Sequence, residues 1–249
     1  MKKPGSAMRT VLVTGAAGGI GTRLRKLLDG VYPRIIWSDI RAPADLKRSK
    51  DFVQADIADL AAMEKLCKGV DGIVHLGGES VEQSRDRILR ANIVGCYNLF
   101  EAARRQKVKR VVFASSNHAV GFYPRQRKIG TDEPVRPDSR YGVSKAFGEA
   151  LGALYAFKHG LRVTCIRIGL DHPELRCEIF FGASDNARAW WDNEAAYRYG
   201  YRPTGVAENF AAQALKAQTK LSPDPIGDWY QGGPFCSDEC DSGFDPAAT

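Results

Sequence analysis

A tyrosine and a lysine four positions apart, Tyr141 and Lys145, are the residues best suited to proton transfer in this chain. At this spacing two side chains share one face of a helix. An ammonium group beside a phenol lowers the phenol's pKa from about 10 toward neutrality, where a general acid or base works best. The same lysine can bind a ribose. Because surface pairs with this spacing also arise by chance, the interpretation depends on the surrounding elements.

Ser116 supplies that context, in the run Ser-Ser-Asn-His at residues 115–118. This run follows a predicted apolar strand at residues 109–114, and open α/β sheets bind ligands at the carboxyl ends of their strands. A serine there can hold a substrate oxygen beside Tyr141. We therefore predict that Ser116, Tyr141 and Lys145 form a catalytic site.

A glycine-rich turn, Thr-Gly-Ala-Ala-Gly-Gly-Ile-Gly at residues 14–21, stands between a predicted strand at 9–13 and a predicted helix at 20–28. Gly15 permits the tight turn, Gly18 lets the backbone approach a pyrophosphate, and Gly21 packs the helix on the strand. The helix N-terminus offers unpaired N–H groups to phosphates. The turn therefore predicts a bound dinucleotide, with Gly15, Gly18, Gly19, Ile20 and Gly21 at its phosphates.

Two aspartates extend the predicted cofactor site. Asp39 ends the second predicted strand, at residues 34–37, where a carboxylate binds the ribose hydroxyls. It would repel a 2′-phosphate, so we expect NAD rather than NADP, although Arg41 works against this preference. Asp56 follows the third predicted strand, at residues 51–54, and either bonds the adenine amino group or is a helix N-cap or a loop aspartate.

Apolar strands alternate with helical segments along most of the chain. Further strands are predicted at residues 72–76 and 162–168, and long helices at 84–106 and 139–159. This order predicts an α/β fold, a Rossmann-type doubly wound parallel sheet with a small C-terminal substrate-binding region. We expect a single domain over 1–249, with an NAD-binding core at 8–169 and a substrate-side region at 170–249. There we expect a strand at 178–181, a helix at 208–220 and an irregular tail from residue 222.

The composition narrows the class of partner. The net charge is +7, but the basic residues are dispersed except at 104–110, where they stand at a predicted helix end that favours cations. We therefore expect neither nucleic acid nor a membrane as partner. Without a signal peptide or a long apolar run, we expect a cytoplasmic protein. Cys67, Cys96 and Cys165 lie in apolar patterns typical of buried thiols, and no cysteine spacing predicts a metal site.

Taken together, these residues resemble the extended short-chain dehydrogenase/reductase family. A closer resemblance, to the uronate dehydrogenases, is carried by residues 74–78, 80–82, 113–118, 141–145, 167–169, 182–184 and 190–193. It implies NAD-dependent oxidation of D-glucuronate or D-galacturonate at C1 to the aldarolactone. Tyr141 would then be the base, Ser116 would bond the reacting oxygen, and Lys145 would tune Tyr141 and bind ribose.

The resemblance also implies the remaining site residues. Ser80, Asn117 and His118 would contact the sugar together with Ser116 and Tyr141, and Asn92 would support a proton-relay water. The cofactor would further contact Ile57, Leu76, Gly77, Asn92, Tyr141 and Lys145. Related enzymes often pair through their two long helices, so the resemblance implies a homo-oligomer.

The chain departs from that pattern after Gly169, where a serine and an arginine for the substrate carboxylate are expected. Leu-Asp-His-Pro follows instead, and Arg176 is a weak substitute. Either the segment is absent from the protein, or residues were omitted there and the link from 169 to 170 is not a normal peptide bond. Two other functions stay open: a nucleotide-sugar epimerase or dehydratase, and a non-catalytic NAD-binding module.

Overall fold

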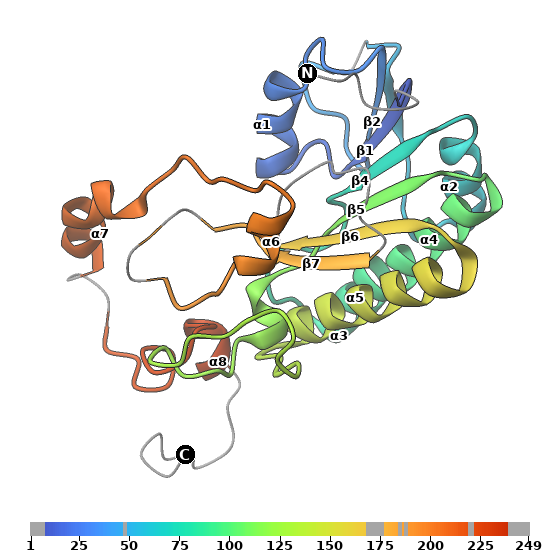
Figure 1. Cartoon of the computed structure of the whole chain (residues 1–249). Coiled ribbons are helices and arrows are strands. Elements are labelled where there is room, and N and C mark those ends of the chain that lie inside the picture. The colour runs from blue at the N-terminus through green and yellow to red at the C-terminus, as the bar shows by residue number, and fades with distance from the viewer. Residues whose placement is uncertain are drawn as a thin grey trace.

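The computed structural model describes residues 8–46, 49–167, 177–183, 186, 189–218 and 222–238. Its centre is a seven-stranded parallel sheet in the order β3-β2-β1-β4-β5-β6-β7 (Figure 1). The strands are β1 (Thr10–Thr14), β2 (Arg34–Asp39), β3 (Phe52–Gln54), β4 (Gly72–His75), β5 (Arg110–Ala114), β6 (Arg162–Arg167) and β7 (Cys177–Phe181). The chain reverses direction across the sheet between β1 and β4. The carboxyl ends at such a switch point are where ligands bind.

Helices cover both faces of the sheet, as the predicted doubly wound fold requires. One face carries α2 (Leu60–Cys67), α4 (Gly95–Arg105) and α5 (Arg140–His159), and the other carries α1 (Gly19–Leu27) and α6 (Glu194–Arg198). Alternate strand residues serve the two faces: Val111 and Phe113 join the larger core, whereas Val112 packs with the cluster beneath α6. The expected near-continuous apolar strands follow from this burial on both sides.

The two long predicted helices exist, with one change of geometry. The first consists of α3 (Arg85–Ile88), a π-helical turn (Leu89–Val94) and α4. The second, α5, begins after Ser139, whose hydroxyl accepts the Gly142 N–H at 2.9 Å, and ends at Gly160 with φ +70°. A serine N-cap and a left-handed glycine are the usual helix boundaries.

The C-terminal part of the chain is more ordered than its composition predicts. The expected strand is β7, and the expected helix at 208–220 is a 3₁₀ turn (Ala207–Phe210) followed by α7 (Ala211–Gln218). The expected irregular tail instead packs against residues 121–127 and contains α8 (Pro234–Ser237). The Gln231 N–H donates to the Tyr123 carbonyl at 3.0 Å, and Gly232 N–H donates to Gly121 at 2.9 Å. Contacts between segments so far apart in the chain produce no periodic pattern in the local sequence, so the sequence did not predict this order.

The remaining expectations concern the cysteines, a membrane-spanning helix, a metal site and the junction after Gly169. Cys67, Cys96 and Cys165 are buried thiols outside any disulfide, as predicted, and Cys236 is another. Within the described ranges no helix is long and apolar enough to cross a membrane, and no three His, Cys, Asp or Glu residues are grouped to hold a metal. The junction after Gly169 and Arg176 lie outside the described residues.

Candidate active site

The glycine turn between β1 and α1 has the backbone geometry that a dinucleotide needs. Gly15 has φ +71°, and a Cβ there would come within 2.6 Å of the Leu76 carbonyl carbon. A Cβ at Gly21 would overlap the Gly15 carbonyl oxygen, so α1 can pack this closely on the turn only with a glycine at position 21. The turn opens into a cavity of about 910 Å³ at the carboxyl ends of the strands. These residues fit the cofactor that the sequence predicts.

Most predicted site residues line this one cavity. They are Gly15, Gly18, Gly19, Ile20, Gly21, Asp39, Asp56, Ile57, Leu76, Gly77, Ser80, Ser116, Asn117, Tyr141 and Lys145. Phe181 and Trp191, which were not predicted as site residues, also line it. Asn92 and His118 do not. The structure therefore brings the predicted cofactor and catalytic residues together, whereas Asn92 and His118 each follow a lining residue, Ala91 and Asn117, in the chain.

Asp39 and Asp56 differ in how their carboxylates are held. The Asp39 carboxylate accepts the Ala17 N–H at 2.9 Å, so it stands beside the glycine turn, where a ribose would lie. Asp56 accepts Arg90 at 2.6 Å and the Ala58 N–H at 2.9 Å. Burial alone would raise the Asp56 pKa, but these hydrogen bonds lower it overall. Asp56 is not a helix cap, because the N-cap of α2 is Asp59.

The three predicted catalytic side chains converge. Tyr141 and Lys145 lie in the first two turns of α5 and are both buried. The Ser116 hydroxyl at the end of β5 is near enough to the Tyr141 phenol to act on its pKa. The Lys145 ammonium donates to the Ala114 carbonyl at 2.9 Å and lies 5.3 Å from the centre of the Tyr141 ring. The hydroxyls of Ser116 and Tyr141 and the ammonium of Lys145 thus lie together at the carboxyl end of β5, on the cavity wall.

The expected lowering of the Tyr141 pKa is absent. Burial raises the pKa of this phenol, the Ser116 hydroxyl opposes the rise only in part, and the charge of Asp138 adds to it. Burial also lowers the pKa of Lys145 to about 8. Desolvation disfavours the charged form of both groups, and it is the largest cause of both shifts.

Asn92 hydrogen-bonds to two different segments of the chain. It lies in the π-helical turn, and its Nδ2 donates to the Glu79 carbonyl at 3.0 Å and to the Ser144 hydroxyl at 2.9 Å. Its Oδ1 accepts the Glu79 N–H at 2.7 Å. The Ser144 hydroxyl in turn donates to the Tyr141 carbonyl at 2.7 Å. Asn92 therefore ties the loop after β4 to the helix that carries Tyr141.

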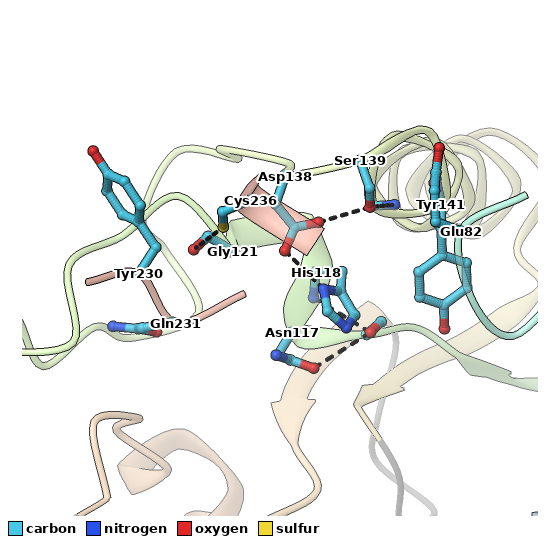
Figure 2. A network of polar contacts seen from close by, with 12 residues as sticks. Glu82, Asn117, His118, Gly121, Asp138, Ser139, Tyr141, Tyr230, Gln231 and Cys236 are labelled. Atoms are coloured by element: carbon cyan, nitrogen blue, oxygen red, sulfur yellow. Dashed lines mark hydrogen bonds and ion pairs between the residues drawn. The ribbon is translucent and has the colours of Figure 1, made fainter. Parts of the chain in front are cut away.

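Two histidines next to the site have different surroundings. His75 is fully buried, its Nδ1 is 2.7 Å from the Thr14 hydroxyl, and burial lowers its pKa to about 3, so it is a neutral core residue. His118 lies 2.7 Å from the buried Asp138 carboxylate through its Nδ1 (Figure 2). Asp138 was missed because its position before Ser139 reads only as part of a helix start.

Glu82 was also missed as a functional residue, although it lies in a run that carries the family resemblance. Its carboxylate accepts the Tyr141 N–H at 2.8 Å and the Arg140 guanidinium at 2.7 Å. In the sequence, Glu82 is an acidic residue six positions after the strand predicted at residues 72–76. No other local feature indicates this role. The partner lies 59 residues away.

The comparisons with known proteins agree with this geometry. A sequence profile of the NAD dependent epimerase/dehydratase family matches residues 11–170. The chain is 39% identical to a uronate dehydrogenase of Pseudomonas putida, covering 90% of this chain and 94% of that protein. It is 38% identical to one of Agrobacterium fabrum, covering 92% and 97%.

Solved structures give the same result. A glucuronic acid dehydrogenase from Chromohalobacter salexigens is 39% identical, with a TM-score of 0.86 over 92% of this chain and 97% of that chain. A mutant uronate dehydrogenase from Agrobacterium tumefaciens complexed with NAD is 37% identical, with a TM-score of 0.86 over 93% and 98%. The chain therefore belongs to the NAD-dependent epimerase/dehydratase family and, within it, to the uronate dehydrogenases.

Proposed function

We propose that this chain is an NAD-dependent oxidoreductase that oxidises a hexuronic acid, D-glucuronate or D-galacturonate, at C1 to the aldarolactone. One observation carries the proposal: Ser116, Tyr141 and Lys145 line the same cavity as the glycine turn and Asp39. A proton-transfer site and a dinucleotide site are therefore contiguous, as oxidation of an alcohol by NAD requires. The family membership indicates the sugar acid as substrate.

The protein's residues divide the reaction between them. Tyr141 accepts the proton of the C1 hydroxyl through its phenol oxygen, while Ser116 donates to the same substrate oxygen. Lys145 holds the ribose and supplies positive charge that stabilises the Tyr141 phenolate, which becomes a phenol when it takes the proton. NAD, when bound, supplies the acceptor for the hydride that leaves C1. The C1–H and O–H bonds break and a C1–O double bond forms, giving lactone, NADH and a proton.

Ser80, Asn117 and His118 contact the sugar in this proposal, and Asn92 orders the loop that carries Ser80. The NAD-binding core comprises residues 8–169, and residues 170–249 form the substrate side of a single domain. Support comes from the cavity, because Phe181 and Trp191 of the later region line it together with the catalytic residues.

The protein also forms a homo-oligomer in the cytoplasm. Large apolar side chains stay exposed along α4 and α5: Tyr97, Val143, Leu154 and Phe157. Exposed large apolar side chains on these two helices support an interface between subunits there. Buried thiols outside any disulfide suit a reducing compartment. Light scattering should give a mass above that of one chain, and Leu154→Lys should reduce it to a monomer.

NADH formation at saturating NAD tests the activity with D-glucuronate, D-galacturonate, glucose and galactose. Turnover of the two acids but not of the neutral sugars supports the proposal, and no turnover with either acid refutes it. Tightly bound NAD that is never released would favour an epimerase or dehydratase instead. Tyr141→Phe should lower kcat by about 10² to 10⁴-fold while NAD binding persists. Full activity in this variant would show that the phenol is not the base.

A further inference from the structure

Asp138 is a buried carboxylate that the proposed reaction does not use. It precedes α5, and its side chain has no exposed surface. One oxygen lies 2.7 Å from Nδ1 of His118, and the other accepts the Ser139 hydroxyl at 2.7 Å, as Figure 2 shows. A buried carboxylate is stable only when it is paired and hydrogen-bonded. His118 is the ring that lies within hydrogen-bond distance of it.

Three glycines from three different segments make room for this carboxylate. A Cβ at Gly121, after β5, or at Gly232, in the C-terminal segment, would overlap one Asp138 oxygen. A Cβ at Gly142 in α5 would lie 3.0 Å from the other oxygen. The carboxylate therefore sits where the loop after β5, the start of α5 and the C-terminal segment (residues 222–238) meet. Its placement depends on all three.

The His118 ring is held on several sides. Phe235 of the C-terminal segment lies against it, with ring centres 3.9 Å apart and planes inclined by 31°. The Tyr141 ring is 5.6 Å away in an edge arrangement. The backbone N–H of His118 also donates to the Ser116 hydroxyl at 3.3 Å, which fixes the main chain next to the ring. His118 is thus bracketed by the proposed catalytic residues on one side and by the C-terminal segment on the other.

We propose that Asp138 is a positioning residue for the sugar: it keeps a proton on Nδ1 of His118 and fixes the ring, so that Nε2 is the nitrogen presented to substrate. A carboxylate at Nδ1 selects one tautomer and one ring orientation. Phe235 holds the ring face, which makes the C-terminal segment part of the substrate site. The inference rests on the proposed function in taking His118 as a sugar contact.

Asp138→Asn tests the proposal with little change of shape. An asparagine amide can donate to Nδ1 and so select the opposite tautomer, as in the serine-protease triad. We expect the KM for uronate to rise at least about tenfold while the KM for NAD changes less than about twofold. Phe235→Leu should raise the KM for uronate by a smaller factor. Asp132→Asn, at an exposed aspartate in the same loop, is the matched control and should match wild type.

Nitrogen-15 NMR of the imidazoles gives a second readout that needs no activity. The chain has four histidines, and His118→Gln identifies the signal of interest. Wild type should show a protonated Nδ1 on His118, and Asp138→Asn should change that signal. An unprotonated Nδ1 in wild type overturns the proposal even if the variant does not fold.

The kinetic outcomes separate this inference from the proposed function. A wild-type KM for uronate in Asp138→Asn overturns the positioning role. So does an equal loss for NAD and uronate together with a lower melting temperature, because that indicates a structural role alone. Absence of uronate turnover in wild type, with the expected NMR signal present, refutes the proposed function and leaves the Asp138–His118 geometry established.

Discussion

The Glu82 carboxylate accepts the backbone N–H of Tyr141 at 2.8 Å, which joins the loop after β4 to the first turn of α5. Its other oxygen accepts the Arg140 guanidinium at 2.7 Å, and its side chain is largely shielded from solvent. The N-terminal end of a helix carries a partial positive charge, which favours a carboxylate there. The loop that carries Ser80 therefore also anchors the helix that carries the proposed base.

Replacing Glu82 with glutamine should weaken its contacts with the start of α5 while the side chain keeps nearly the same size. We expect Glu82→Gln to lower the free energy of unfolding by about 1 kcal/mol, because the charge at the helix N-terminus is lost. We also expect a lower kcat, since the start of α5 positions Tyr141. Denaturant unfolding and steady-state kinetics measure the two effects. Glu64→Gln, which removes a surface ion pair with Arg105, is the control; equal behaviour of the two variants would contradict the anchoring role.

The raised pKa of Tyr141 predicts how oxidation depends on pH. Tyr141 must be a phenolate to accept the substrate proton, and the fraction of phenolate grows as the pH rises toward the raised pKa of Tyr141. We expect kcat/KM to increase from about pH 7 to about pH 10, because the ordinary phenol pKa is about 10 and burial raises it. A pH series of initial rates at saturating NAD measures this. A flat profile over that range would contradict the assignment of Tyr141 as the base.

The buried charge of Lys145 should lower the free energy of unfolding, although the side chain is needed for activity. Its pKa in the folded protein is about 8, below the ordinary 10.5, because burial disfavours the ammonium. Between these values the unfolded chain binds more protons, so the free energy of unfolding rises with pH across that interval. Below the folded pKa the full penalty is present.

Lys145→Met should therefore melt at a higher temperature than wild type near pH 7, with a smaller difference near pH 10, and should lose most activity. Calorimetry at the two pH values tests the sign. Part of the gain is offset because the Ala114 carbonyl loses its donor. Lys68→Met, at an exposed lysine, is the control and should shift little. A melting temperature below wild type at both pH values would count against a strained buried cation.

Asp39 should set the cofactor preference. Its carboxylate stands at the glycine turn beside Ala17, and Arg41 lines the same part of the cavity. In Asp39→Ser the repulsion of a 2′-phosphate disappears and Arg41 can attract that group. We expect the ratio of kcat/KM for NAD over NADP to fall at least about tenfold. Asp45→Asn, an exposed acid that pairs with Arg25, is the control. An unchanged ratio would show that Asp39 does not face the ribose.

The sequence by itself was enough for the features that depend on short spacings. Gly15, Gly18 and Gly21 predicted the turn; a positive φ excludes a side chain at Gly15, and close helix packing excludes one at Gly21. Tyr141 and Lys145 predicted one helix face because four residues make about one turn. The strand pattern predicted the doubly wound sheet because strands buried on both faces must be apolar throughout.

Only the tertiary structure decided the rest, because it depends on segments far apart in the chain. His118 and Asp138 are 20 residues apart, and the Phe235 that covers the imidazole comes from a tail whose composition indicated irregular structure. The sign of the Tyr141 pKa shift is the clearest case. The spacing to Lys145 suggested a lowered value, whereas the shift is upward because burial removes water from both groups, and burial is a property of the packed fold.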